Sequence, residues 1–462
     1  MSTTQPTTGP ELIARLDRIP IWPYPTSTLW IIGAGFFFAF FDIVTIGFAL
    51  PVLTREFGVS EEQATWAVTS GLIGYILGSF LDSRIGDRYG RRISLYLSVG
   101  AFSLGSLLSA TSTTLDQLLF WRFVSGMGIG AEIALVTTYM AECSPAPLRG
   151  RFTGWTIVAA YLGFAAVPLL AFHLVPEYTW GWRALFLMGA LGGIAIGFMR
   201  KGMPDSLHWL IEQGRLEEAQ ANLEAAEVRA ESRLGRALPP PAAVTETPDG
   251  APESAPAGIR ALFLPPYRSR LLILASLWFV YYVGNYAWLT LAAELFSKHG
   301  LSLSQTIGSL SFTGFGFVAG AITAVYISDR VDRRVAAAAT ALVWAAILAG
   351  IGFTASATTI PVLGFIASFT IGLIVPLLYT ITGESFATGV RATGVSLSDG
   401  IGHLGGAFCG QIVFAVEATA GFSGAFLAMA ATGLLSAGLV MLTTRNTGRA
   451  LNAVERRPDP RS

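Results

Sequence analysis

Long apolar runs alternate with short polar segments along most of the chain. Runs of about 17 to 25 residues are long enough for a helix to cross the ~30 Å hydrocarbon core of a bilayer. Six runs precede residue 200 and six follow residue 269: 28–51, 64–83, 93–111, 117–140, 153–174, 182–199, 270–293, 307–327, 335–354, 360–383, 392–416 and 421–442. The pattern predicts an all-α membrane protein with twelve transmembrane helices in two six-helix bundles.

The polar segments divide the chain into five parts: a tail, 1–27, the first bundle, 28–199, a loop, 200–269, the second bundle, 270–442, and a second tail, 443–462. The beginning of the loop combines charge with helical periodicity, which predicts one or two surface helices. Its later part, ALPPPAAVTETPDGAPESAPAG, is rich in Pro and Ala and is typical of a disordered linker.

Basic residues are distributed unevenly over the two sides of this topology. With an even number of crossings, both termini share one side with the loops at 84–92, 149–151, 200–270, 330–334 and 391. That side holds every Lys and Arg except Arg55, Arg183 and Lys298 on the other side and Arg122 within a helix. Since cytoplasmic loops carry the excess of positive charge, we expect both termini in the cytoplasm and the chain in the plasma (inner) membrane, as a functional monomer.

The composition narrows the possible functions. The 462 residues are 52% hydrophobic and 13% charged, against roughly 25% charge in soluble domains. A formal net charge of zero and the lack of a basic stripe argue against nucleic-acid binding. The sequence has no GxxxxGK[ST] run and no Cys/His cluster with metal-ligand spacing, so it predicts no enzyme, cofactor or metal centre.

The two halves carry an internal repeat. GDRYGRR at 86–92 is echoed by SDRVDRR at 328–334, and Glu142 followed by Arg149 is echoed by Glu384 followed by Arg391, always 242 positions later. A shared offset with six helices per half indicates a parallel duplication about an axis along the membrane normal. Halves related in this way place a substrate site between them near the middle of the membrane.

Three motifs carry a resemblance to a known family. GDRYGRR, WRFVSGMGIG at 121–130 and the PLRGR that follows resemble the signature set of the major facilitator superfamily across nearly the whole chain. YMAECSPAPLRGR and PDSLHWL are similar to the sugar-porter pattern. GIGAEIALVTTY, WFVYYVGNY and VRATGVSLSDGIGHLGG look closer to the niacin, organic-cation and synaptic-vesicle branch and its metabolite:proton symporters. The resemblance implies the major facilitator fold and secondary transport.

The repeated loop motifs predict a breakable latch at the cytoplasmic helix ends. Arginines there can bridge to carboxylates, which are favoured near helix N-termini, and the resemblance implies that such loops hold the outward-facing state. The alternative is that they only anchor the chain by positive charge. The candidate gating residues are Asp87, Arg88, Arg91, Arg92, Glu142, Arg149 and Arg151 in the first half and Asp329, Arg330, Arg333, Glu384 and Arg391 in the second.

Ionisable residues within the apolar runs are few and costly, at roughly 2.5–3.5 kcal/mol each on insertion scales. Asp42 and Arg122 lie at depths that allow an ion pair, and the sugar-porter resemblance implies proton coupling there. A static structural pair is the alternative. Glu132 lies ~15 Å deeper than Arg122 and on another side of the helix, so it needs another partner. Gly126, Gly128 and Gly130 predict close helix packing rather than a nucleotide loop.

A second group of candidates lies in the second half. Asp399 and His403 are four residues apart and share a helix face, which suits a carboxylate–imidazole contact for solute or proton; ordinary packing is the alternative for His403. Relatives usually carry Arg at this position. Aromatics with one Asn suit a flat or amphipathic solute. The substrate-binding candidates are Tyr282, Asn285, Tyr286, Trp155, Tyr379, Glu132, Asp399 and His403.

These features predict a secondary active transporter that moves a small organic metabolite, an organic acid or organic cation, with protons by alternating access. The alternatives are a drug or product exporter, a sugar porter, or a membrane sensor built on the same fold. The Gln residues that sugar porters use are absent, which argues against a hexose. Gly163 and Pro168 are separated, so the Gly-Pro element of proton-driven drug antiporters is also missing.

Overall fold

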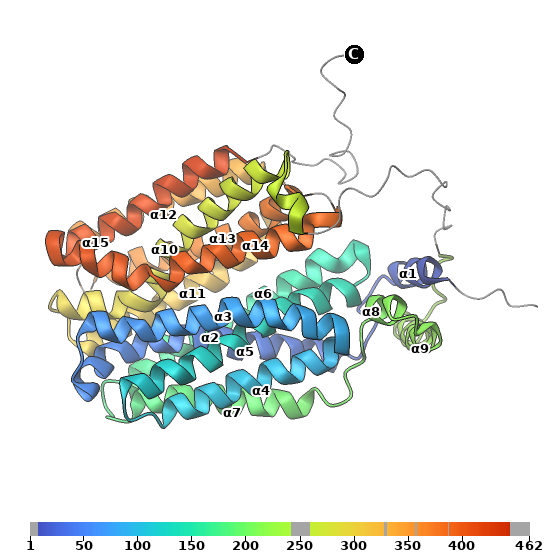
Figure 1. Cartoon of the computed structure of the whole chain (residues 1–462), viewed down its shortest axis with the longest axis horizontal. Helices are drawn as coiled ribbons and strands as arrows, with labels where there is room; N and C mark the ends of the chain where they lie inside the picture. Colours follow the sequence, from blue (N-terminus) through green and yellow to red (C-terminus); the bar gives the residue numbers. More distant parts are fainter. Residues whose placement is uncertain are drawn as a thin grey trace, which may run out of the picture.

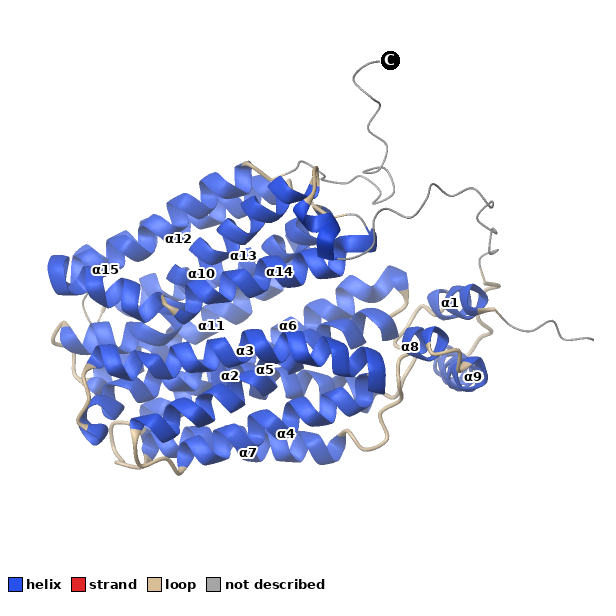
Figure 2. Cartoon of the chain, viewed as in Figure 1, coloured by secondary structure: helices blue, strands red, loops and turns tan. Residues whose placement is uncertain are grey.

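The computed structural model describes residues 8–241, 259–327, 330–354, 356, 358–386 and 388–443. Within this part the secondary structure consists of helices joined by loops, with no strand (Figure 2). The predicted all-α fold is confirmed. Most of the Pro/Ala-rich linker, from residue 242 to residue 258, lies outside the described residues.

Six long helices form the first half: α2 (Thr26–Phe57), α3 (Glu61–Tyr89), α4 (Arg91–Ala110), α5 (Leu115–Cys143), α6 (Arg149–Leu174) and α7 (Gly181–Met199). The second half contains α10 (Tyr267–Lys298), α11 (Leu303–Ile327), α12 (Arg333–Thr354), α13 (Ile360–Glu384), α14 (Thr388–Ala407) and α15 (Cys409–Met441). Eleven of the twelve predicted apolar runs lie within one helix to within a residue, and the run 392–416 extends from α14 into α15.

The last two crossings are separated near Gly421, as predicted, and not at the boundary between α14 and α15. By length and composition, eleven helices in the described part of the chain could span a membrane, and the last extends over 49 residues, Thr393–Met441. At 1.5 Å per residue this is ~74 Å, more than twice the bilayer core. The chain turns at Gly421, whose backbone is non-helical (φ 66°, ψ −168°). Helical hydrogen bonding continues through Phe408, so α14 with the first part of α15 makes one crossing and the remainder of α15 makes the twelfth.

Glycines bring α3 and α5 together, and the same contacts recur in the second half. A Cβ at Gly78 would lie 1.9 Å from Met127 O, and one at Gly126 would lie 1.9 Å from Gly71 O, so neither position tolerates a side chain. Gly320 stands 242 residues after Gly78, and a Cβ there would lie 2.1 Å from Phe369 O of α13. The repeated contacts support the duplication, and the predicted packing role of the glycines in 126–130 is confirmed.

A small helical unit lies beside one end of the first half (Figure 1). It consists of α1 (Gly9–Asp17), α8 (Leu207–Glu212) and α9 (Leu216–Leu234), and we name this end of the molecule the α9 end. Its own apolar core contains Leu12, Leu16, Ile19, Leu207, Trp209, Leu210, Ala219, Leu223, Ala226, Ala230 and Leu238. The surface helices of the loop are confirmed, whereas α1 lies in a segment that the sequence analysis described only as a tail.

The two halves meet at the end opposite α9. There Lys298 Nζ of α10 lies 2.8 Å from Glu61 Oε2 of α3, and the Thr69 hydroxyl donates to Ala407 O over 2.6 Å. Helices α2 and α10 pack together in this region, whereas α5 and α13 are not among the closely packed pairs. From this contact, α3 and α14 diverge toward the α9 end (Figure 1). The structure is therefore closed at the opposite end.

Candidate functional site

The predicted pair of Asp42 and Arg122 is formed inside the first half. Arg122 of α5 donates from Nη1 to Asp42 Oδ2 of α2 over 2.5 Å. Ser125 donates to the same oxygen over 2.8 Å, and Ser106 of α4 donates to Oδ1. Both charged residues are almost completely buried, and the guanidinium lies over the Phe186 ring of α7 at 5.3 Å. Three helices thus meet at the Asp42 carboxylate, and a fourth, α7, contacts the guanidinium of its partner.

The two serines are site residues that the sequence analysis missed. They compensate the negative charge of Asp42 together with Arg122, which a buried carboxylate needs because it has lost water. Nothing in the spacing of Ser106 and Ser125 links them to Asp42. The only available signal was that small hydroxyl residues stand on apolar helices that pack against the helix of Asp42.

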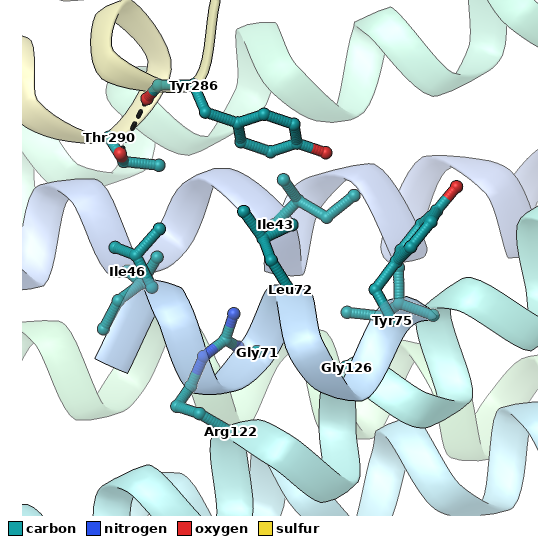
Figure 3. A pocket seen from close by; sticks show the side chains of 11 residues that line it. Ile43, Ile46, Gly71, Leu72, Tyr75, Arg122, Gly126, Tyr286 and Thr290 are labelled. Atoms are coloured by element: carbon teal, nitrogen blue, oxygen red, sulfur yellow. Dashed lines mark hydrogen bonds between the residues drawn. The ribbon is translucent and has the colours of Figure 1, made fainter. Parts of the chain in front are cut away.

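A pocket of about 20 Å³ lies between the two halves beside this pair (Figure 3). Arg122 points toward it from α5, and the rings of Tyr75 and Tyr286 bound it on the α3 and α10 sides. This volume is about that of one water molecule, so an organic solute enters only after the halves move. The lining residues are Ile43, Ile46, Val68, Gly71, Leu72, Tyr75, Arg122, Gly126, Ile129, Tyr286 and Thr290.

The second half contributes a carboxylate surrounded by aromatic side chains. The hydroxyls of Tyr282 and Tyr379 donate to Asp399 Oδ1 over 2.9 and 2.8 Å. His403 Nδ1 lies 2.9 Å from Asp399 O and 3.4 Å from Asp399 Oδ2. Because a carbonyl only accepts, Nδ1 carries a proton, and neutral His403 therefore has an unprotonated Nε2. The structure brings together four of the predicted residues, from α10, α13 and α14.

Tyr286, Asn285 and Trp155 occupy different surroundings. Tyr286 is buried, with its ring centroid 5.7 Å from that of His403. Asn285 is 5% exposed, and its Oδ1 has no hydrogen-bond partner among the described residues, so a polar group of α10 remains available there. Trp155 lies on α6 with half of its surface exposed. Of these three residues, Tyr286 is in ring contact with the cluster around His403.

Glu132 is held in a second buried ion pair. Its carboxylate accepts from Arg200 Nη1 over 2.9 Å, from Arg200 Nη2 and from the Ser98 hydroxyl over 2.7 Å. Arg200 also donates to Leu95 O over 2.7 Å, and both charged side chains are at most 1% exposed. Glu132 therefore lies among α4, α5 and the end of α7, apart from the pocket. Its partner was missed because the apolar run ends at residue 199.

The latch positions form matching ion pairs at the α9 end of both halves. Arg91 Nη2 lies 2.9 Å from Glu142 Oε1, and 242 positions later Arg333 pairs with Glu384. Glu142 also accepts from the Ser206 hydroxyl over 2.5 Å, which joins this latch to α8. The predicted bridging of the loop arginines to Glu142 is confirmed for Arg91.

The other latch candidates have various surroundings. Arg88 lies over the Tyr89 ring at 5.4 Å, the Arg92 amide donates to Asp205 Oδ1 over 3.3 Å, and Arg391 Nε donates to Phe386 O over 3.2 Å. Arg149 Nε is buried without a partner in the described part of the chain, and Arg151 and Arg330 are exposed. Asp329 and the side chain of Asp87 lie outside what the structure describes.

Comparisons with known proteins agree with this architecture. The family model described as sugar (and other) transporter matches residues 27–456. The chain is 26% identical over 448 residues to the niacin transporter NiaP of Acinetobacter baylyi, covering 96% of this chain and 99% of the relative. It is 26% identical over 400 residues to the 4-hydroxybenzoate transporter PcaK of Pseudomonas aeruginosa, covering 86% and 87%.

A solved structure shows the same fold. The partially occluded inward-open xylose transporter XylE from Escherichia coli superposes with a TM-score of 0.73 at 18% identity, covering 92% of this chain and 99% of that chain. The family match covers most of the sequence, and the helices repeat in two halves as the motifs predicted. The chain belongs to the sugar (and other) transporter family and is a major facilitator secondary transporter of small solutes in the membrane.

Proposed function

We propose that this transporter couples the uptake of a small aromatic organic acid to the entry of protons across the inner membrane. The α9 end then faces the cytoplasm, in agreement with the distribution of basic residues. One monomer, with its two halves, suffices for alternating access. The observation that carries the proposal is the buried pair of Asp42 and Arg122 beside a pocket between the halves.

Asp42 serves as the proton carrier in this proposal. When Asp42 is charged, the attraction of Arg122 and two serine hydroxyls holds α2, α4 and α5 together. A proton on Asp42 removes the charge and weakens this attraction, while Arg122 remains charged. Arg122 is then free to attract an anionic solute in the adjoining pocket. Protonation and anion binding therefore favour each other, as symport requires.

The aromatic cluster supports a flat acid as the solute. Tyr282, Tyr286 and Tyr379 surround His403 and Asp399, and flat rings pack favourably against such side chains. Three relatives are named as transporters of niacin, 4-hydroxybenzoate and gallate, and each of these compounds carries one carboxylate on an aromatic ring. Organic cations are the second candidate, because Asp399 offers them a carboxylate that is still 15% exposed.

Uptake by proteoliposomes tests the coupling. With an acidic exterior, wild-type protein is expected to accumulate labelled 4-hydroxybenzoate or niacin, and a protonophore should abolish the accumulation. Asp42→Asn should lose concentrative uptake but retain exchange of internal for external solute, because exchange does not require return of the empty carrier. Asp116→Asn, which changes an exposed carboxylate at the start of α5, is the control. Normal accumulation by Asp42→Asn would show that Asp42 does not carry the proton.

A further inference from the structure

One aromatic contact joins the two halves beside the proposed solute site. The Tyr75 ring of α3 stacks on the His403 imidazole of α14, with centroids 4.1 Å apart and planes 17° from parallel. Both residues are at most 5% exposed. The His403 ring also meets the Tyr282 ring of α10, with centroids 4.4 Å apart. The imidazole is thus enclosed by tyrosines from both halves.

Each ring is held firmly by its own half. A Cβ at Gly130 would lie 2.0 Å from Tyr75 O, so α3 and α5 are in backbone contact at this residue. On the other side, a Cβ at Gly402 would lie 2.6 Å from Trp278 Cβ, so α14 lies directly on α10. Movement of one half relative to the other therefore changes the distance between the Tyr75 and His403 rings, because neither helix can shift easily within its half.

We propose that Tyr75 and His403 form an aromatic slot across the interface of the halves, and that the ring of the solute acid inserts between them. This rests on the proposed function and adds Tyr75 as a residue that determines specificity. A solute ring between them makes one stacked contact with each side chain, with centroids about 4.5 Å apart. The Tyr75 and His403 centroids must therefore separate to about 9 Å. The slot is closed in the present structure and opens as α3 and α14 separate.

The groups facing His403 explain how the slot would also hold a carboxylate. Asp399 lies on the same helix, Tyr75 on α3, and Tyr282 and Tyr286 on α10. Tyr379 of α13 reaches Asp399. Since His403 Nδ1 donates to Asp399 O, the imidazole carries a positive charge that attracts a solute carboxylate only when Nε2 is also protonated.

Binding of a matched pair of acids to purified protein in nanodiscs tests the slot. The probes are 4-hydroxybenzoate and 4-hydroxycyclohexanecarboxylate, which differ mainly in the aromaticity and flatness of the ring. Wild-type protein should bind the aromatic acid more tightly. Tyr75→Leu should reduce this preference by about 2- to 10-fold, the range expected for one aromatic pair. Tyr75→Phe should preserve it, and Tyr326→Leu, at an exposed position of α11, is the control.

The outcomes separate this inference from the proposed function. If Tyr75→Leu weakens both acids equally, Tyr75 only supports the structure and the slot is refuted. If the wild type binds the two acids equally well, the slot is likewise refuted while acid transport stands. If the wild type binds neither acid, the proposed solute class and the slot are both wrong.

Discussion

The buried ion pairs of the first half have no counterparts in the second. At the positions 242 residues after Asp42 and Arg122 stand Gly284 and Gly364. Glu132 and Arg200 likewise correspond to Ile374 and Leu442. Because a buried charge is strongly unfavourable without its partner, both members of a pair must be gained or lost together. The first half therefore carries the internal charge pairs, and the second half carries the aromatic cluster.

Protonation of His403 is the residue-level switch that we expect to set the pH dependence of solute binding. For an anionic solute, affinity should fall as pH rises, because a neutral His403 no longer attracts the carboxylate. His403→Arg should keep the affinity and remove this dependence. The measurement is the dissociation constant of 4-hydroxybenzoate against pH for both proteins.

An organic cation gives the opposite result, since protonated His403 repels it. Its affinity should rise with pH, and His403→Arg should abolish its binding. His173→Arg, at an exposed position near the end of α6, is the control. Identical flat profiles for wild type and His403→Arg would mean that His403 is an ordinary packing residue.

At the scale of elements, one carboxylate fastens α1 to α9. Glu227 lies 2.7 Å from both Arg15 Nη2 and Arg18 Nη2. Partial burial raises the pKa of Glu227, but hydrogen bonds and attraction from Arg15 and Arg18 outweigh burial, so its pKa is lowered overall. The interaction therefore stabilises the unit above the pKa of an unfolded glutamate, about 4.3, and is lost as pH falls through the lower, folded value.

Replacing this carboxylate should loosen α1 at neutral pH. Glu227→Gln leaves the two arginines without their charged partner. It should speed the hydrogen exchange of α1 amides, because the free energy needed to open α1 falls by about 1 kcal/mol. After correction for intrinsic rates, the difference from wild type should shrink once the pH is below the folded pKa. Glu217→Gln, at an exposed position of α9, is the control. Unchanged exchange at pH 7 would mean that the apolar core alone holds α1.

At the scale of the whole molecule, Lys298 holds the closed end together. Its Nζ lies 2.8 Å from Glu61 Oε2 of the first half and 2.6 Å from Glu417 Oε2 of α15. Lys298→Ala should raise the fraction of molecules whose halves are separated at this end by about 2- to 5-fold, because each partly exposed ion pair contributes up to about 1 kcal/mol. The native Cys409, which is fully buried near this end, can report the opening.

The measurement is the rate at which a membrane-impermeant maleimide labels Cys409 in a Cys143→Ser background. Labelling should be faster in Lys298→Ala than in the parent protein. Lys201→Ala, at an exposed position of the α9 end, should leave the rate unchanged. Equal rates in all three proteins would contradict the role of Lys298 in holding the two halves together at this end.

Several features of this architecture followed directly from the sequence. Apolar length predicted the crossings, and the 242-residue offset predicted that loop arginines in both halves bridge to equivalent carboxylates, as Arg91 does with Glu142 and Arg333 with Glu384. Both signals are local: a residue in lipid must be apolar, and duplicated segments retain their spacing. The pair of Asp42 and Arg122 was also predictable, because so few charges lie within the apolar runs that depth alone nearly selects the partners.

Other contacts depended on the tertiary structure. Arg200 lies just beyond its apolar run, so hydropathy could not reveal that it turns inward to Glu132. The stack of Tyr75 on His403 joins helices from different halves, and its existence depends on how those halves sit relative to each other. That arrangement results from many weak contacts summed over whole helices, and no single stretch of sequence encodes it. The sequence determined the helices and their charges, and packing of the two halves decided which side chains meet.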